Sequence, residues 1–393
     1  MNFLTILIYI DRYLGGLIIK ISEILVFIKQ KINKNYKADI NNITFENIVI
    51  IKFLGIGSIS RSLGLLENLN KKFPKAKITF ITFSENKNFI KLVQIIDNYK
   101  FLEKRNFLYF LFTLIKLLIF NQLLNKKTLY IDLECHSNFS KIISFLNYSN
   151  FKIGFYIKNK SNIFNHSIFF DRLSFIESNY NKISAYLKVE NSNHKSKLDL
   201  LKLKDKDISI EKKLKNVNLS KDDKFFVINI NASDLCIERK WDILNFENLI
   251  RRLLDNKYKI ILIGSKEEHK NTRLIKEKFI NFKDQIFNFA GLTSIGELIS
   301  LFKDYKIVFV TNDSGPLHLA NISKCATISL WGPGNPVHYA ENYRNHKILY
   351  KKVHCSPCIY VNLNPPCKGN NICMKEINVE EVFKESIILI NKI

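Results

Sequence analysis

Short apolar runs alternate with amphipathic stretches along most of the chain. Such runs occur at 48–54, 77–83 and 128–133, and they start again after residue 224, at 225–230, 259–264, 307–311 and 326–330. Continuous runs of this length predict strands buried on both faces, and the segments between them, such as 60–73, have helical spacing. Strands that alternate with helices form parallel sheets covered by helices on both sides. The sequence therefore predicts an α/β protein with two doubly wound, Rossmann-like domains facing a central cleft.

The domain boundary is predicted from a change in composition. Residues 191–224 are rich in Lys and contain few large apolar side chains, which is typical of a linker. We therefore expect a first domain over 45–200 and a second over 215–393.

The segment 1–35 before the first domain predicts an amphipathic helix. Apolar residues recur at alternating spacings of four and three, and charged residues such as Lys20 and Glu23 fall on or near the opposite face. The apolar positions are Ile10, Leu14, Leu17, Ile21, Ile24 and Ile28. No stretch of about 18–20 residues is free enough of charge to span a bilayer. Two alternatives remain: the helix lies on an anionic membrane surface, or it packs on its own domain.

A second apolar segment, 106–125, is interrupted only by Lys116. Its hydropathy is that of a candidate spanning helix. However, it lies between predicted strands of one sheet, and a span would place the halves of that sheet on opposite sides of a bilayer. We expect an apolar helix that is buried or dips into the membrane surface.

Composition narrows the class of protein. Of 393 residues, 47% are hydrophobic and 24% charged, which excludes a disordered or fibrous chain. The net charge of +24 comes mainly from scattered Lys residues, without the Arg cluster of phosphate-reading proteins, so no nucleic-acid partner is expected. The chain begins without a small-residue cleavage site, and a cytoplasmic location is expected.

Polar residues gather where the strands of the second domain end, and ligands bind at such ends in open α/β sheets. The strand at 307–311 runs into Asp313, Ser314 and Gly315, where a following helix would offer backbone amides to a diphosphate. Arg239 or Lys240, after the strand at 225–230, could neutralise its charge. Simple capping of the helix by Asp313 or Ser314 is the alternative. The convergence of segments favours a diphosphate site.

The segments 310–320 (VTNDSGPLHLA) and 328–334 (ISLWGPG) resemble glycosyltransferase family 9, the ADP-heptose:lipopolysaccharide heptosyltransferases of GT-B architecture. The resemblance extends over about 47–383 and includes 132–134 (DLE) and 152–155 (KIGF). It implies inverting transfer of a sugar, heptose from ADP-heptose, to a lipopolysaccharide-core or related lipid-linked glycan. It also implies that no cofactor is required, and that the protein works at the inner face of the cytoplasmic membrane.

The resemblance also implies roles for individual residues of the nucleotide-sugar site. Phosphates would contact Asn231 and Ser233, the sugar diphosphate would contact Arg239, and the ribose hydroxyls would meet Glu268. The diphosphate and the donor sugar would be surrounded by Asp313, Ser314, Gly315 and His318.

The chain departs from the family at the expected catalytic base. The family has Gly-Asp where this chain has Gly57 and Ser58, and a serine hydroxyl cannot take a proton from the acceptor at neutral pH. Glu134 or Asp132 replaces the base, or a different acceptor and base are used, or the chain binds without turnover. A different nucleotide-sugar donor is a further alternative.

Ser60 and Arg61 follow this position and are candidates for binding an anionic acceptor. Near the C-terminus, Cys355 and Cys358 form a C-x₂-C pair that is followed by Cys367 and Cys373. The spacing of the last two is looser than in a standard zinc ribbon, so packed thiols are expected, with a structural zinc site or disulfides as alternatives.

Overall fold

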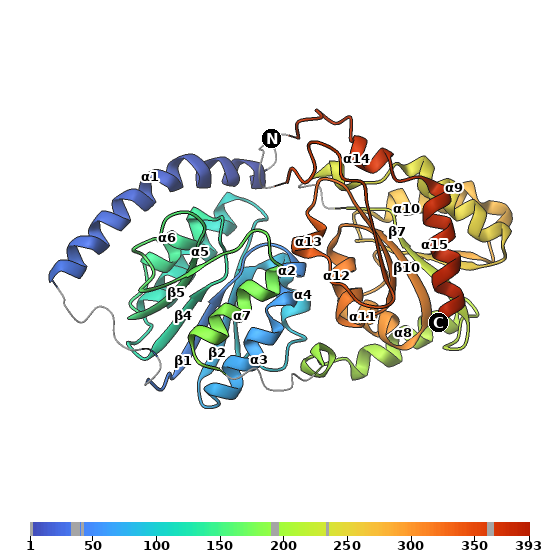
Figure 1. Ribbon diagram of the computed structural model, residues 1–393. Coiled ribbons are helices and arrows are strands. Elements are labelled where there is room, and N and C mark those ends of the chain that lie inside the picture. The colour runs from blue at the N-terminus through green and yellow to red at the C-terminus, as the bar shows by residue number, and fades with distance from the viewer. Residues whose placement is uncertain (1–2, 33–39, 41–42, 190–195, 233–235, 360–364) are drawn as a thin grey trace. The chain divides into compact units, whose positions relative to one another are not determined.

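The computed structural model describes residues 3–32, 40, 43–189, 196–232, 236–359 and 365–393. The chain divides into two compact units, Met1–Leu200 and Leu201–Ile393 (Figure 1). Each unit has its own parallel sheet and its own helices.

The N-terminal unit contains a six-stranded parallel sheet of order β3-β2-β1-β4-β5-β6. Residues 48–51 at its centre are fully buried, because helices cover both faces. The strands are β1 (Asn47–Ile51), β2 (Lys77–Phe83), β3 (Asn98–Leu102), β4 (Thr128–Asp132), β5 (Phe151–Tyr156) and β6 (His166–Phe169). The order shows that the chain reverses its direction across the sheet between β1 and β4.

Right-handed crossovers place the helices of the two directions on opposite faces of this sheet. One group is α2 (Ile56–Arg61), α3 (Leu63–Lys72), α4 (Lys87–Ile90) and α7 (Ile176–Tyr186). The other face carries α5 (Phe107–Gln122) and α6 (Asn138–Phe145), whose Phe110, Leu117 and Ile143 join one core cluster with β1, β2 and β4.

The predicted N-terminal helix is present as α1 (Phe3–Ile32), and it packs alongside α6 (Figure 1). The Asp11 carboxylate accepts hydrogen bonds from the backbone N–H groups of Asn138 and Phe139 at the start of α6. One helical stripe, which includes Ile19 and Val26, is buried against the unit. Helix α1 thus packs on its own unit through this narrow stripe, and its contact with a membrane surface stays a prediction. The six expected apolar residues, from Ile10 to Ile28, are all exposed.

Helix α5 is half-buried. Phe110, Leu117 and Asn121 face the sheet, whereas its other side is exposed, including Leu108 and Phe112. Among the described residues, no helix combines the length and apolar character needed to cross a membrane.

The C-terminal unit repeats the topology with a parallel sheet of order β12-β11-β10-β7-β8-β9. Its strands are β7 (Lys224–Asn229), β8 (Lys259–Leu262), β9 (Ile286–Asn288), β10 (Lys306–Asn312), β11 (Ala326–Trp331) and β12 (His346–Tyr350). Its helices are α8 (Lys204–Lys215), α9 (Ile243–Asp255), α10 (His269–Lys278), α11 (Ile295–Asp304), α12 (Gly315–Ile322), α13 (Pro336–Tyr339), α14 (Ile372–Lys375) and α15 (Val379–Lys392). The apolar faces of α9 and α15 pack into one core with β7, β10 and β11.

All seven predicted strands are present, with ends shifted by a few residues. Five further strands, β3, β5, β6, β9 and β12, were not predicted because they are short or have mixed polarity. The predicted linker 191–224 contains a helix, α8, that packs on the C-terminal unit, so the prediction was wrong for this part of the segment. Ile210 and Leu214 bury one side of that helix, and Lys213 pairs with Glu297 of α11 at 2.6 Å.

We expect Gly154→Ala to lower the free energy of unfolding by about 1–3 kcal/mol, because overpacking strains a core. A Cβ at position 154 would lie 2.4 Å from ring carbons of the buried Phe164. Urea denaturation measures the change. Gly16→Ala on α1 is the control, since a Cβ there meets nothing within 4 Å and a gain of about 1 kcal/mol is expected from helix propensity. Equal destabilisation of both variants would contradict this packing.

Candidate active site

Each sheet has one point where its strand order reverses, and ligands of doubly wound folds bind beyond the strand ends at such a point. In the N-terminal unit this point lies between β1 and β4, and in the C-terminal unit between β7 and β10. The predicted base residues follow β1 and β4, and the predicted nucleotide-sugar residues follow β7, β8 and β10. Both candidate sites thus occupy the position that the topology favours.

In the C-terminal unit, the guanidinium of Arg239 pairs with the carboxylate of Asp313, with Nε 3.3 Å from Oδ2. Arg239 belongs to a short helical turn (Ile237–Arg239) after β7, and Asp313 directly follows β10. Burial raises the pKa of Asp313, and the Arg239 charge opposes that rise. Gly334 leaves room for this carboxylate, because a Cβ there would lie 2.5 Å from Oδ2.

A second part of this site surrounds Gly264, beyond the end of β8. A Cβ at this glycine would lie 3.0 Å from Nδ2 of Asn231 and 3.1 Å from Oε2 of Glu268. Glu268 also accepts a hydrogen bond from the backbone N–H of Ser265 at 2.7 Å. Nδ2 of Asn231 is buried and has no hydrogen-bond partner within the described residues. A buried, unsatisfied donor is costly, so this amide is suited to an acceptor oxygen of a ligand.

The helix-capping alternative for Asp313 and Ser314 does not account for their contacts. Ser314 occupies the N-cap position of α12, but its side chain makes no capping hydrogen bond. Its hydroxyl bonds instead to Thr311 at 2.9 Å and accepts from Asn229 at 3.1 Å. The first amides of α12, from Gly315 onward, are therefore not capped by this side chain.

The sequence prediction missed the residues that fix these loops. Asn229 ends β7 and also donates to Thr311, while Asn312 donates to the backbone of Ile230 and Asn231. The amide oxygen of Asn312 accepts the backbone N–H of Trp241 at 3.0 Å. A polar residue at the end of an otherwise apolar strand was the available signal. Lys240 and His318 are half-buried beside this network, and Ser233 lies outside the described residues.

In the N-terminal unit, Glu134 is tied to the segment that follows β1. Its Oε1 accepts the backbone N–H groups of Phe53 at 2.8 Å and Leu54 at 3.1 Å. Its Oε2 lies 2.7 Å from Nζ of the buried Lys52. Burial lowers the pKa of Lys52, but the neighbouring Glu134 outweighs that effect, so the pKa is raised overall. The buried Lys52 therefore compensates the charge of the Glu134 carboxylate.

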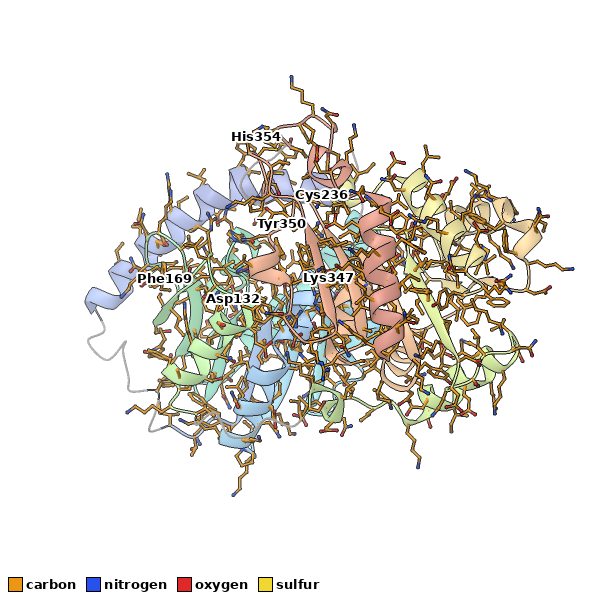
Figure 2. The ribbon with its side chains drawn as sticks, turned by 45° about the vertical axis from the view of Figure 1, so that its right-hand side comes forward. Asp132, Phe169, Cys236, Lys347, Tyr350 and His354 are labelled. Carbon is orange, nitrogen blue, oxygen red and sulfur yellow. The ribbon has the colours of Figure 1, made fainter. Side chains whose placement is uncertain are left out.

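Ser58, in α2, lies at the same edge of the sheet and is half-buried. The Tyr180 hydroxyl interacts with Ser58 and lies in the field of Lys52 and Glu134, and burial raises its pKa. Asp132, labelled in Figure 2, is fully buried at the end of β4. It accepts the backbone N–H of Glu134 at 2.9 Å and the Ser144 hydroxyl at 3.1 Å. Ser58 and both candidate carboxylates thus lie at or after the ends of the neighbouring strands β1 and β4.

The two predicted acceptor residues point inward. The Ser60 hydroxyl donates to the Gly57 carbonyl at 2.7 Å, and Arg61, which is 2% exposed, lies over the Phe175 ring at 5.0 Å. Their role in acceptor binding stays a prediction.

The family model for glycosyltransferase family 9 (heptosyltransferase) matches residues 137–365, more than half of the chain. The chain belongs to glycosyltransferase family 9.

Curated relatives carry the same family name at modest identity. Lipooligosaccharide heptosyltransferase 2 of Campylobacter jejuni serotype O:6 is 27% identical over 191 residues, 46% of this chain and 57% of the relative. Lipopolysaccharide heptosyltransferase 2 of Escherichia coli K12 is 30% identical over 100 residues, 25% of this chain and 28% of the relative. The matched segment thus spans about half of the first relative and about a quarter of the second.

Solved structures of family 9 share the fold. The family 9 glycosyl transferase of Veillonella parvula has a TM-score of 0.71 at 17% identity, covering 89% of this chain and 99% of its own. ADP-heptose lipopolysaccharide heptosyltransferase II of Escherichia coli has a TM-score of 0.63 at 14% identity, covering 88% and 99%. These similarities confirm the predicted fold class for this family 9 chain.

The four late cysteines of this family 9 chain are near one another. Each is a free thiol, and burial, with a further contribution from the neighbouring thiols, raises the pKa of Cys358 and Cys373. Within the described residues, no group of three or more His, Cys, Asp or Glu side chains is placed to hold a metal ion. The arrangement of these side chains, as it stands, is not that of a zinc site. Metal analysis of the purified protein would test whether the four cysteines bind zinc.

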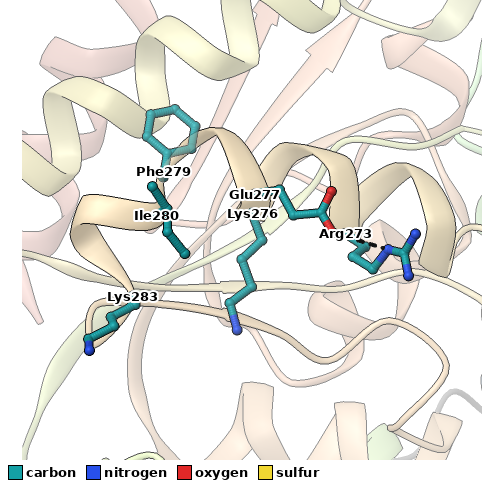
Figure 3. A pocket seen from close by; sticks show the side chains of 6 residues that line it. All are labelled: Arg273, Lys276, Glu277, Phe279, Ile280 and Lys283. Atoms are coloured by element: carbon teal, nitrogen blue, oxygen red, sulfur yellow. Dashed lines mark ion pairs between the residues drawn. The ribbon is translucent and has the colours of Figure 1, made fainter.

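A shallow basic pocket lies at the end of α10, lined by Arg273, Lys276, Glu277, Phe279, Ile280 and Lys283 (Figure 3). Arg273 pairs there with Glu277 at 3.4 Å. None of the predicted site residues lines this pocket, so it is separate from the candidate nucleotide-sugar site.

We expect Asp132→Asn to remove a pH dependence of stability. Burial raises the pKa of Asp132 to about 7, whereas an unfolded Asp titrates near 3.9. Between these values the folded state holds a proton that the unfolded state has lost, so ionisation of Asp132 lowers the free energy of unfolding as pH rises. The slope is at most about 1.4 kcal/mol per pH unit, and it ends above pH 7. Urea denaturation from pH 4 to 8 should show the free energy of unfolding of the variant rising relative to that of wild type as pH increases. The same pH dependence in both proteins would contradict a raised pKa for Asp132.

Proposed function

We propose that this chain transfers a sugar, heptose from ADP-heptose, to a lipid-anchored lipopolysaccharide-core or related glycan. The observation that carries the proposal is the nucleotide-sugar site. An unpartnered Asn231 amide and the Arg239–Asp313 ion pair lie at the strand ends around the β7/β10 reversal. The names of the relatives support it, since both are called heptosyltransferase 2. A solved structure of Escherichia coli heptosyltransferase WaaC with ADP-2-deoxy-2-fluoro heptose has a TM-score of 0.59 to this chain at 14% identity.

In the proposed complex, the diphosphate contacts the first amides of α12 at Gly315, together with the side chains of Ser314 and Asn231. Arg239 and Lys240 compensate its charge, and Glu268 accepts hydrogen bonds from the ribose hydroxyls. His318 and Asp313 contact the sugar side of the diphosphate, and Ser233 belongs to the same proposed set. Positive charge and helix amides stabilise the departing nucleotide diphosphate, so the proposed step requires no metal.

The proposed reaction is an inverting displacement with Glu134 as the base. The acceptor hydroxyl oxygen bonds to the anomeric carbon, the bond from that carbon to the phosphate oxygen breaks, and ADP leaves with the electron pair. The hydroxyl proton passes to the Glu134 carboxylate. Glu134 is 8% exposed while Asp132 is fully buried, which favours Glu134 over Asp132 as the group that meets an acceptor.

Two other functions follow from particular residues. Ser58 in place of the family's Asp motivates a non-catalytic protein that binds the nucleotide-sugar or a lipid surface. A different donor sugar is compatible with the same phosphate contacts. Calorimetric titration with ADP-heptose and with other ADP-, UDP- and GDP-sugars distinguishes the donors. Binding of ADP-heptose without transfer to a lipid A–Kdo acceptor would favour the non-catalytic alternative.

We expect Arg239→Gln to raise the dissociation constant for ADP-heptose at least about tenfold. The change removes the positive charge of Arg239 that would face the diphosphate. It also leaves Asp313 buried without its cation. Isothermal titration calorimetry measures the affinity. Arg252→Gln is the matched control, because Arg252 pairs with Glu380 at 2.6 Å on the surface of the same unit. Affinities equal to wild type in both variants would rule out the proposed donor site.

We expect Glu134→Gln to lower kcat by about 10²–10⁴-fold with little change in ADP-heptose affinity, since it removes the proton acceptor. Adding Ser58→Asp to this variant should restore part of kcat and move the pH profile, because it returns a carboxylate to the family's position. Glu177→Gln is the control, a glutamate of the same unit paired with Lys197 at 2.7 Å. Unchanged kcat in Glu134→Gln would exclude this residue as the base.

A further inference from the structure

Helix α1 turns its broad apolar face away from the protein. The six residues Ile10, Leu14, Leu17, Ile21, Ile24 and Ile28 are between 46 and 59% exposed. The opposite stripe holds the helix in place, through the Asp11 bonds to α6 and through Ile19, which packs with Ile163 and Phe164. A rotation that buried the apolar face would break these contacts, so the exposure is built into the packing.

Helix α5 exposes a second apolar face. Phe107, Leu108, Phe112 and Ile119 are between 55 and 74% exposed. Lys116 lies among them, with its ammonium 4.1 Å from the centre of the Phe112 ring. A lysine in such a position covers apolar surface with its stem while its charge reaches polar surroundings.

The two faces belong to the same side of the N-terminal unit, since α1 and α5 both contact α6. Asn121 of α5 donates to the Ile143 carbonyl, and Gln122 donates to the Leu146 carbonyl at 2.7 Å. Ile19 of α1 joins Ile142 and Phe145 in one cluster. In Figure 1, α1, α5 and α6 lie together on one flank of the N-terminal sheet. Together these helices expose a group of apolar residues, whereas apolar residues on an ordinary protein surface are scattered singly.

The exposed charged side chains described on α1 and α5 are all basic. Helix α5 contains no Asp or Glu. The two acids of α1 face the protein: Asp11 caps α6, and Glu23 accepts the Ser161 hydroxyl at 2.8 Å. Among the described side chains of these segments, Lys20 on α1 and Arg105 and Lys116 at α5 are exposed. An apolar helix face bordered by cations is complementary to a bilayer with anionic headgroups.

We propose that the outward faces of α1 and α5 form a docking surface for an anionic lipid bilayer. This deepens the proposed function, on which its biological role rests: the acceptor is lipid-anchored, and α1 passes close to the proposed base. Asp11 of α1 caps α6, which begins four residues after Glu134. A docked α1 would therefore hold the Glu134 edge of this sheet near the membrane that carries the acceptor.

The test is co-sedimentation of the full chain with vesicles of phosphatidylcholine, alone or mixed with phosphatidylglycerol. Wild type should bind the mixed vesicles more strongly, and Leu17→Glu combined with Phe112→Glu should weaken binding by about tenfold or more. Lys20→Gln with Lys116→Gln should remove most of the preference for phosphatidylglycerol. Ile208→Glu is the matched control, an apolar residue of α8 that is 54% exposed in the C-terminal unit.

The proposal is overturned if wild type does not sediment with mixed vesicles, or if Leu17→Glu with Phe112→Glu binds as wild type does. It is also overturned if these substitutions abolish a dimer in the absence of lipid while vesicles are not bound, since the face would then cover a second copy. Circular dichroism confirms that each variant is folded. Transfer to a water-soluble acceptor fragment is measured in parallel: loss of vesicle binding with transfer retained separates this surface from the proposed reaction.

Discussion

The pairing of β1 with β4, and of β7 with β10, is the constraint on which both candidate sites depend. Parallel backbone hydrogen bonding aligns Ile51 with Asp132 and Thr311 with Asn229, so the loops after these strands leave the sheet side by side. Those loops come from segments about eighty residues apart in the chain. Because strand order reverses there, no crossover helix covers the strand ends, and polar side chains can gather without being buried beneath a helix.

Two partly buried ion pairs distinguish these sites from the apolar sheets behind them. Lys52–Glu134 and Arg239–Asp313 each place a charge where solvent cannot stabilise it, so each partner depends on the other. Such pairs are weak evidence for stability, because replacing both partners by apolar groups often costs little. Their position at the reversal of strand order is better explained by chemistry. In the proposed reaction, Lys52 compensates the charge of the carboxylate that meets the acceptor, and Arg239 provides the cation for the diphosphate.

Helix α1 is tied to the same region by a capping carboxylate. Asp11 meets the first amides of α6, where a negative charge is favoured by the helix dipole. Burial raises the pKa of Asp11, and these backbone hydrogen bonds oppose that rise. The contact fixes the rotation of α1 about its axis, and this rotation decides which of its sides meets solvent.

The sequence by itself determined the fold class, the seven strongest strands and the segment around Asp313, because buried parallel strands and strand-end glycines leave strong local patterns. It also identified Glu134 and Asp132 as the carboxylates near Ser58. Only the tertiary structure decided which side of α1 faces the protein. The periodicity of the sequence shows that the helix has two different sides, but not which surface each side contacts. The same holds for Lys52, Asn229 and Asn312, whose roles arise from contacts with residues up to 82 positions away. Helix α8 was missed because its buried side has only two apolar residues. Its packing on α11 stabilises a helix that its own sequence pattern does not predict.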